Sequence, residues 1–457
     1  MKLTVEGFKS IKKVKEFEFM PFTVLAGINS SGKSSLIQIL LLLKQTLSSK
    51  DILSVKGPYV YADSIKDLLY WKEGGELKIA ISARVDEMSH QAGERFSSLL
   101  GRDAQMKTMS SSFTFSVNGK VKLTQLTLNV DGEQETSYSW KLTEAKDVTD
   151  AYELQAKQVS TGMRVQTLPS KKYIPQFENF IPLYFEEYGS RDASTMDVKM
   201  FKSVAAEALL YYLHEVMDLI YYIKALRVEP DLKKSYNTAV NRAYIDSDGQ
   251  NLQFVYNEKK NEPVRGKETL NAALVRWLGK ELDLSHDIDI HQDEEKFYHT
   301  LLQMQKGLDV DLCQVGFGVS QVLPILVQGL LTPKGGTLIV EDPEVHMHPR
   351  VQAGLVDFFI EMIQDGKDVI IETHSDHFVT RIRRRVAEKQ LDPQIVNLCF
   401  VSRNQESGSL YQTIDVKAQG VLQAPLPEGF LDVQDDDFRA ILRAKLENTK
   451  IETPMQE

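Results

Sequence analysis

The chain of 457 residues carries a formal net charge of −10, and its residues are 42% hydrophobic and 26% charged. This balance is that of a globular protein; the length predicts two or three lobes, and the composition excludes a chain that is disordered throughout. The acidic total argues against general polyanion binding, and only two cysteines, Cys313 and Cys399, exclude a disulfide framework or a cysteine-based zinc site.

The first residues show neither the charged nor the apolar region of a secretory signal. Residues 1–26 predict short strands, of which the apolar run 22–26 suits a buried strand. A glycine-containing loop follows, and then a helix that runs to Leu47. The longest apolar stretch, residues 36–43, is far below the roughly 20 residues that cross a bilayer. We therefore expect a soluble, cytoplasmic protein without membrane contact.

Residues 78–170 are rich in strand patterns. The pairs Asn118-Gly119 and Asp131-Gly132 are turn signals between them. This part of the chain predicts an antiparallel subdomain built from hairpins.

The pattern becomes helical near residue 195. Residues 201–226 have apolar positions at helical spacing and predict one long helix that ends before Pro230. A second helix is predicted at 271–282, with Trp277 on its apolar face, and the polar stretch 258–267 predicts a loop.

From residue 306 the pattern returns to α/β, with buried strands at 337–340 and 369–371. The middle segment is then an insertion that divides one α/β domain in two. The three parts are residues 1–185, with the glycine-containing loop and the β-subdomain, 186–304, which is mainly helical, and 305–457, which completes the α/β domain.

Residues 27–34, Gly-Ile-Asn-Ser-Ser-Gly-Lys-Ser, match the P-loop pattern between a strand and a helix. Glycines let backbone N–H groups point at phosphates, and the helix N-terminus adds a favourable dipole. Lys33 would reach the β- and γ-phosphates, and the Ser34 hydroxyl would bind Mg²⁺. The alternative is a glycine-rich turn with a chance lysine. The candidate nucleotide-binding residues are Asn29, Ser30, Ser31, Gly32, Lys33, Ser34 and Ser35.

Two acids, Glu341 and Asp342, follow the apolar run 337–340. They therefore stand at the carboxyl end of a predicted strand, where open α/β sheets bind ligands. Glu341 would organise Mg²⁺ through water, and Asp342 would orient or deprotonate the attacking water. An apolar run that ends in acids is common by itself, and the P-loop gives this one its meaning.

His374 follows the second of these strands and could hydrogen-bond the γ-phosphate, although a lone histidine after a strand is more often structural. Residues 315–321 place Gly318, Ser320 and Gln321 before a predicted helix. They predict a second phosphate-binding cap. The alternative is an ordinary glycine loop with a serine N-cap.

In this order, the P-loop, the glycine–serine cap, the strand-end acids and the histidine resemble the head domain of ABC-type ATPases. The opening residues 8–11 and the run 341–349 are similar to SMC-like, RecF-like and OLD-like ATPases rather than to transporter subunits. Segments 225–230, 247–252 and 427–430 resemble one bacterial branch of that group.

The resemblance implies an α/β fold: an ABC-type head with a mixed sheet and an antiparallel β-subdomain, interrupted by the helical insertion. It implies ATP and Mg²⁺ as cofactors, and a homodimer or higher oligomer through paired heads. Residues 316–321 would be a signature loop that serves the partner's P-loop, and 346–349 would lie between the two sites.

The chain departs from the family pattern at three positions. Glu341 stands where aspartate is commoner, and Asp342 stands where glutamate is commoner. No convincing Q-loop glutamine is found; Gln45 lies within the first helix, and Asp63 is the other candidate. These departures predict slow hydrolysis, with ATP acting more as a clamp than as fuel.

The resemblance further implies the ATPase component of a bacterial anti-phage defence system. The segment after His374 shows no acid constellation of a nuclease. A separate nuclease effector, of the HNH type as in Septu-like pairs, would therefore be bound and restrained. The alternatives are a RecF-like or SMC-like ATPase of DNA repair or chromosome maintenance, a transporter subunit, and an ATP-locked scaffold.

Other residues have two readings each. The basic run 381–385 and the lysines at 9, 12, 13 and 15 could contact DNA phosphates or form solvated faces. The histidines at 346 and 348 suggest a metal or, more simply, packing at the dimer joint. The acids 435–437 could bind a cation or be solvated, and the tyrosines at 221 and 222 suit a core or an interface.

Overall fold

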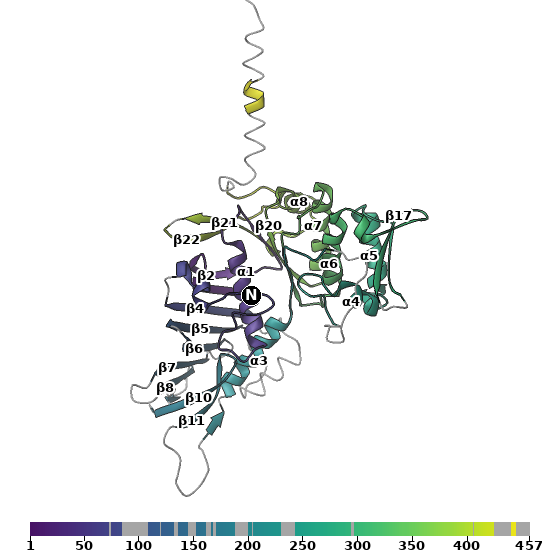
Figure 1. The fold of residues 1–457 in the computed structure, drawn as a ribbon. Helices are drawn as coiled ribbons and strands as arrows, with labels where there is room; N and C mark the ends of the chain where they lie inside the picture. Colours follow the sequence, from purple (N-terminus) through teal and green to yellow (C-terminus); the bar gives the residue numbers. More distant parts are fainter. Residues whose placement is uncertain are drawn as a thin grey trace, which may run out of the picture.

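The structure, a computed structural model, is drawn as a ribbon in Figure 1. The residues that the structure describes are 1–72, 75–84, 108–118, 120–131, 136–144, 152–160, 166–167, 171–187, 200–202, 204–229, 243–293, 297–404, 406–424 and 440–444.

Parallel strands form the centre of the molecule. Their bounds are β3 (Phe22–Ala26), β13 (Ile220–Ile223), β19 (Thr337–Glu341), β20 (Asp368–Thr373) and β21 (Val396–Asn404). β3 lies between β20 and β21, β19 borders β20, and β13 borders β19. β22 (Gly408–Thr413) pairs antiparallel with β21. All five residues of β3 are buried, as its apolar sequence predicts.

An antiparallel subdomain continues the sheet, as the hairpin signals predict. Its strands are β1 (Lys2–Phe8), β2 (Ile11–Glu18), β4 (Glu76–Arg84), β5 (Thr108–Asn118), β6 (Lys120–Asp131), β7 (Thr136–Glu144), β8 (Tyr152–Ser160), β9 (Gln166–Thr167), β10 (Lys171–Glu178), β11 (Ile181–Glu187) and β12 (Met200–Lys202). The hairpins β5–β6 and β6–β7 are confirmed, while Gly119 and Gly132 lie outside the described residues. Ile11 pairs with Gly408 and connects this subdomain to β22.

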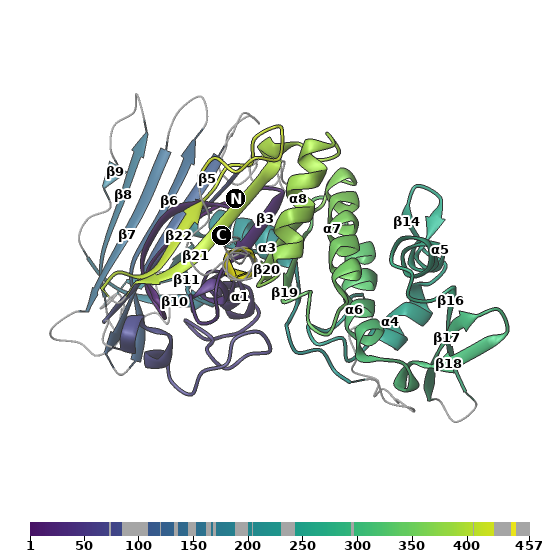
Figure 2. The same cartoon turned by 90° about the horizontal axis from the view of Figure 1, so that it is seen from above.

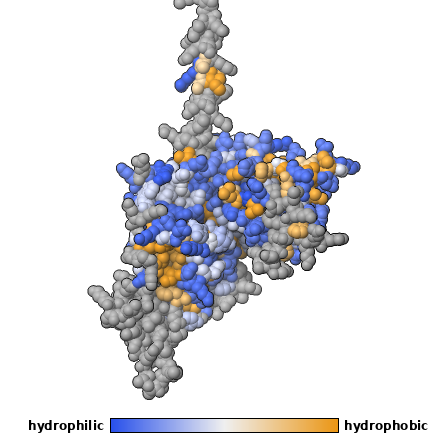
Figure 3. Space-filling model, in the orientation of Figure 1, coloured by the Kyte–Doolittle hydropathy of each residue, from blue (hydrophilic) through white to orange (hydrophobic). Residues whose placement is uncertain are grey.

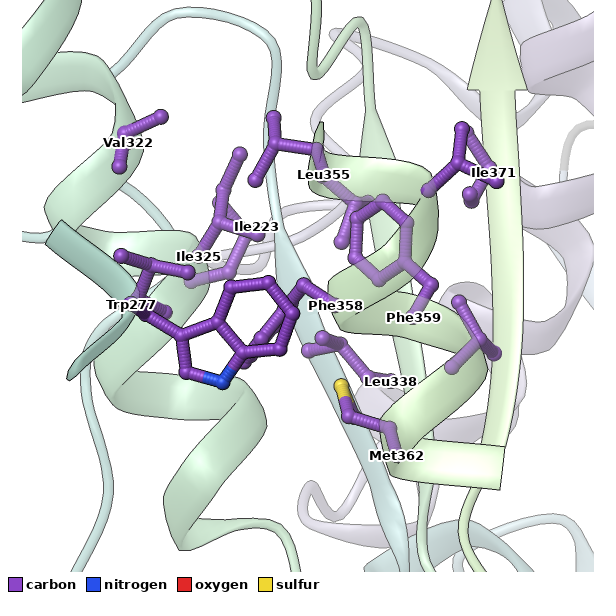
Figure 4. Close-up of a cluster of buried hydrophobic side chains, with 14 of the residues drawn as sticks. Ile223, Trp277, Val322, Ile325, Leu338, Leu355, Phe358, Phe359, Met362 and Ile371 are labelled. Carbon is purple, nitrogen blue, oxygen red and sulfur yellow. The ribbon is translucent and has the colours of Figure 1, made fainter. Parts of the chain in front are cut away.

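Helices cover both faces of the parallel strands. They are α1 (Lys33–Leu47), α3 (Val204–Asp218), α6 (Phe317–Leu331), α7 (Pro349–Gln364) and α8 (Asp376–Ala387). Alternate side chains of β19 divide the core: Ile339 packs in the cluster of α1 and α3, and Leu338 packs in the cluster of α6 and α7. Figure 4 shows the second cluster, where Phe358 and Phe359 of α7 lie against the sheet. The mixed α/β fold with its β-subdomain is thus confirmed.

The long helix predicted at residues 201–226 is wrong in its second half. α3 ends at Asp218, and residues 220–223 form β13, which pairs with β19 of the central sheet. Tyr221 and Tyr222 therefore lie on a strand and not on a helix. Because β13 belongs to the central sheet, part of the middle segment is integral to the α/β domain. The boundaries at 185 and 304 stay a prediction.

The rest of the middle segment combines helices with strands, so the expectation of a mainly helical insertion omitted its sheets. The elements are α4 (Leu252–Lys259), β14 (Pro263–Arg265), β15 (Glu268–Thr269), α5 (Leu270–Arg276), a π-helical turn (Trp277–Glu281), β16 (Asp287–Gln292), β17 (Tyr298–Gln305) and β18 (Leu308–Asp311). The loop predicted at 258–267 contains β14. Figure 2 shows this group beyond α6, on the side of α7 away from the β-subdomain.

Trp277 has 3% of its surface exposed and stacks edge-on against Phe358 of α7, with ring centroids 5.1 Å apart. Its indole N–H and the guanidinium of Arg276 both donate hydrogen bonds to the Glu361 carboxylate. The predicted apolar face of this helix is therefore confirmed, and it packs on the α/β domain.

The surface is mixed. On the face in Figure 3 most described residues are hydrophilic, and hydrophobic areas are separate, over the strands of the β-subdomain and beside the helices. Among the described residues, no helix has both the length and the apolar character to cross a bilayer.

Candidate functional site

The loop at residues 27–32 lies between β3 and α1, where the P-loop pattern places it. Gly27 and Gly32 have φ angles of 152° and 102°, which favour glycine. A Cβ at Gly27 would lie 2.3 Å from the carbonyl oxygen of Val401, and one at Gly32 would lie 2.0 Å from the Ser409 hydroxyl. Both glycines are therefore required by backbone conformation and by a close neighbour.

Lys33, the first residue of α1, is buried with 3% exposure. Its ammonium donates hydrogen bonds of 3.0 Å to the carbonyl oxygens of Gly27 and Ile28. Burial lowers the pKa of Lys33, and the nearby carboxylates of Glu372 and Asp342 act in the opposite direction. The lysine thus lies inside the loop and faces the acids at the ends of β19 and β20.

Ser34 donates a hydrogen bond of 2.7 Å to the carboxylate of Glu372. Sequence reasoning missed Glu372, which stands at the carboxyl end of β20 and pairs in register with Glu341 of β19. Burial raises the pKa of Glu372 to about 8, and the neighbouring Glu341 adds to the rise. Its signal was an acid directly after the apolar residues 369–371, level with the acid that ends the adjacent strand.

Four carboxylates of this site have a buried oxygen without a hydrogen-bond partner: Glu341, Asp342, Glu344 and Glu372. Buried carboxylate oxygens without donors are costly, and a cation compensates them. Within the described part of the chain, no three His, Cys, Asp or Glu side chains form a chelating group by themselves. Mg²⁺ usually takes one or two carboxylates, with phosphates and water as its other ligands. Ser34, Glu341 and Glu372 therefore fit Mg²⁺ held together with a nucleotide.

His374 lies beside Asp342, with its Nε2 3.8 Å from the Asp342 Oδ1. Its backbone N–H donates a hydrogen bond to the Glu344 carboxylate. Burial, followed by the charge of Lys33, lowers the pKa of His374 and favours the neutral ring. Asp342 has a φ of 42°, in the left-handed region, and its N–H donates to the carbonyl of Glu372 over 2.9 Å. This turn holds the Asp342 carboxylate level with the ends of both strands.

The expected signature loop lies at the start of α6. Gly316 is the N-cap, so the alternative of a serine N-cap is wrong. The Ser320 hydroxyl donates to the carbonyl of Phe317 over 2.7 Å, and Ser320 and Gln321 are both buried. A Cβ at Gly318 would lie 3.1 Å from the carbonyl oxygen of His346, so this loop adjoins the segment expected between two sites.

Arginines of the basic run in α8 form ion pairs with acids of the same chain. Arg381 and Arg385 both bind the carboxylate of Asp357, and Arg384 binds Glu388 at 2.7 Å. Because these arginines already bind acids of the chain, the structure favours a helix face over a DNA-contacting surface for this run.

The other residues for which the sequence suggested a functional role make structural contacts, where the structure describes them. Lys9 donates to Gln38, and Lys13 pairs with Glu6. His348 caps α7 by accepting from the Arg350 N–H. Gln45 is buried and bonds to the backbone of residues 54–60, so it closes a loop and does not serve as a Q-loop glutamine. The acids 435–437 lie outside the described residues.

The model of the AAA ATPase domain matches residues 1–379 of the chain. The chain belongs to this ATPase family. Together with the P-loop geometry, membership makes it a nucleotide-binding ATPase. A comparison with curated proteins finds no match.

Solved structures of SMC heads are similar to this ATPase at 12% identity. An SMC head bound to the C-winged helix domain of ScpA has a TM-score of 0.46, with 91% of this chain and 97% of that chain covered. The SMC head domain from Thermotoga maritima has a TM-score of 0.36, with 91% and 98% covered. The Smc head with an extended coiled coil, bound to the C-terminal domain of ScpA and derived from Pyrococcus furiosus, has a TM-score of 0.41, with 91% and 96% covered.

The β21–β22 hairpin lies beyond the residues that the ATPase family model matches, yet it supports the P-loop. The Ser409 hydroxyl donates to the carbonyl of Ser31 over 2.6 Å, and the Tyr411 hydroxyl donates to the carbonyl of Gly32 over 2.7 Å. Sequence reasoning missed both residues, because such contacts join positions more than 370 residues apart.

Proposed function

We propose that this ATPase binds ATP with Mg²⁺ at the P-loop and hydrolyses it slowly, at sites completed by a second copy. One observation carries the proposal: the hydrogen bond from Ser34 to Glu372, which brings the P-loop helix to the acids at the ends of β19 and β20. The nucleotide-binding residues would be Asn29, Ser30, Ser31, Gly32, Lys33, Ser34 and Ser35.

In this proposal Lys33 binds the β- and γ-phosphates in place of the two carbonyl oxygens that it now contacts. Asp342 accepts the proton of the water that attacks the γ-phosphorus, and the bond to the ADP oxygen breaks. His374, with a neutral ring, donates a hydrogen bond to a γ-phosphate oxygen. Mg²⁺, held by Ser34, Glu341 and Glu372, would neutralise charge on the phosphates. The shorter side chain at Asp342 supports slow turnover.

Exposed apolar residues on the nucleotide face support pairing of two copies. Ile28 of the P-loop is 50% exposed, and Phe317 at the start of α6 is 51% exposed. In a pair of ABC-type heads, the loop with Gly318, Ser320 and Gln321 would face the partner's phosphates. The Ser320 hydroxyl would then exchange the carbonyl of Phe317 for a phosphate oxygen.

We further propose that the ATPase belongs to a bacterial anti-phage defence complex and restrains a separate nuclease effector, of the HNH type. Its support is the resemblance of the motifs to defence ATPases. The internal pairing of Arg381 and Arg385 with Asp357 favours a regulatory role over a repair ATPase that grips DNA.

ATP hydrolysis by the intact chain and by Asp342→Ala tests the catalytic part. Turnover that is lost on substitution, while binding of a fluorescent ATP analogue persists, supports it. Absence of turnover in both proteins contradicts it and favours the ATP-locked scaffold.

A tagged pull-down with ATP tests the assembly, with Lys33→Ala as the matched control that loses the phosphate contact. A stoichiometric nuclease that depends on Lys33 supports the defence role. Recovery of repair proteins or DNA without a nuclease contradicts that role.

A further inference from the structure

Arg227 is a buried arginine beside the acids of the site, on the segment that follows β13. Its side chain is 6% exposed, whereas its neighbours Leu226 and Val228 are 82% and 37% exposed. The segment is attached at both ends to residues 247–248. The Lys224 N–H donates to the carbonyl of Ser247, and the Val228 N–H donates to the carbonyl of Asp248. Arg227 therefore points inward from an exposed segment.

The guanidinium binds the backbone at the end of β19. Its Nη2 donates to the carbonyl of Glu341 over 2.7 Å and to the carbonyl of Asp342 over 3.1 Å. Asp342 has a φ of 42°, in the left-handed region, which costs energy for residues other than glycine, although aspartate tolerates it better than most. Arg227 thus holds the two peptide groups that flank this strained position.

Two other nitrogens of the Arg227 guanidinium group have no hydrogen-bond partner. Nε and Nη1 are buried and make no hydrogen bond, while the carboxylates of Asp342, Glu344 and Glu341 act to raise the pKa of Arg227 against the effect of burial. Burial lowers the pKa of Arg227 to about 10, so the group remains charged at neutral pH. A buried cation with unused donors is costly unless carboxylates lie close by.

The same segment also holds the side chain of Glu341. Burial raises the pKa of Glu341, and hydrogen bonds from the Tyr222 hydroxyl and the Ala225 N–H act in the opposite direction. Residues 222–227 therefore contact the backbone of the Glu341–Asp342 turn and one of its two carboxylates.

We propose that Arg227 is a positioning residue for ATP hydrolysis: it clamps the strained Glu341–Asp342 turn and so holds the Asp342 carboxylate against the attacking water. The proposal rests on the hydrolytic function proposed above. The Arg227 side chain binds no nucleotide in this account. Its loss therefore lowers the rate of the chemical step and leaves ATP affinity unchanged.

The test compares Arg227→Met and Arg227→Lys with the intact chain and with Arg381→Met, which breaks the ion pair between Arg381 of α8 and Asp357 of α7. Loss of an outer-shell partner typically costs roughly 10–100-fold. We expect Arg227→Met to lower kcat by about that factor and to leave the KM for ATP and the affinity for a fluorescent ATP analogue within roughly twofold. The kcat of Arg227→Lys should lie between those of the intact chain and Arg227→Met, because lysine keeps the positive charge but lacks the planar set of guanidinium donors.

Equal kcat values in Arg227→Met and Arg381→Met would overturn the proposal, and so would a loss of ATP affinity that matches the loss of kcat. If Arg227→Met does not fold, the same comparison with Arg227→Lys decides, since a lysine preserves the buried charge. An intact chain that hydrolyses no ATP contradicts the hydrolytic function itself. Normal hydrolysis by both Arg227 variants contradicts only the role of Arg227.

Discussion

The hydroxyl of Tyr411 donates a hydrogen bond to the carbonyl of Gly32, which spans 379 positions of the chain. Gly32 is the N-cap of α1 and has a left-handed backbone. Burial raises the pKa of Tyr411, so the phenol stays protonated and remains a donor. The P-loop is thus supported through its carbonyl groups, since Ser409 and Tyr411 donate to the carbonyls of Ser31 and Gly32.

Replacement of Tyr411 with Phe should weaken ATP binding and leave the fold intact. A buried hydrogen bond contributes about 0.5–1.5 kcal/mol, so we expect the Kd for ATP to rise roughly 2–12-fold. Titration with a fluorescent ATP analogue measures it. Tyr61→Phe is the control, since Tyr61 is 69% exposed. An unchanged Kd for ATP in Tyr411→Phe would show that the β21–β22 hairpin does not support the P-loop.

Gly32→Ala should abolish ATP binding. The added Cβ would lie 2.0 Å from the Ser409 hydroxyl, at a φ of 102°. The control is Gly335→Ala, where φ is 80° and no atom lies within 4 Å. That control should lose only about 1–2 kcal/mol of stability and keep ATP binding. The double variant Gly32→Ala/Ser409→Ala removes only the shortest contact, since the Ser10 hydroxyl at 2.4 Å, the Cβ of residue 409 at 2.9 Å and the backbone strain remain, so little recovery of binding is expected. Full binding by Gly32→Ala would contradict this account.

Phe317→Asp should prevent ATP-dependent pairing of copies. A charge at the start of α6 would be desolvated at the proposed interface, which is unfavourable without a partner. Light scattering with ATP, in an Asp342→Ala background that retains the nucleotide, gives the mass of the assembly. Leu308→Asp is the matched control, because Leu308 on β18 and Phe317 are both 51% exposed. Equal dimerisation of Phe317→Asp and Leu308→Asp would show that Phe317 does not lie in the interface.

Lys367→Met should change the pH dependence of stability. The ammonium donates to the carbonyls of Gly329 and Leu330, and burial lowers its pKa to about 8. Because the folded pKa lies below the usual value of 10.5, the unfolded chain binds more protons between these two pH values. The free energy of unfolding should therefore rise with pH across this window.

Urea unfolding at several pH values from 7.5 to 10.5 measures that rise. Lys367→Met should flatten it relative to the intact chain, whereas Lys334→Met, at an exposed position, should not. Identical slopes in all three proteins would show that Lys367 titrates normally in the folded state.

Local patterns predicted the parts of the site that are local in sequence. Strand β3, the P-loop and α1 follow one another, and each is specified by glycines and apolar residues within a short window. Residues 220–223 were predicted as helix, because their apolar spacing continues that of α3. They form a strand because β19, more than a hundred positions later, pairs with them.

Glu372 and Arg227 were missed for the same reason. Glu372 acquires its role from the register with Glu341, and Arg227 from two carbonyl groups more than a hundred positions away. Arg227 lies in the segment 225–230 that carries part of the family resemblance, but that resemblance gave it no role at the site. The sequence predicted Glu341 and Asp342 as candidate acids, but it did not predict the residues that contact them.

Strand β3 lies between β20 and β21, both of which follow it by more than 340 positions along the chain. During synthesis on a ribosome, the P-loop strand leaves the exit tunnel long before either of its neighbours exists. A nascent chain can bury the β1–β2 hairpin early, but the edges of β3 stay unpaired until residues 368–404 have emerged. Such edges are prone to misassembly. Nucleotide can therefore stabilise the P-loop strand only after residues 368–404 have emerged, and chaperone protection before that point would fall on β3.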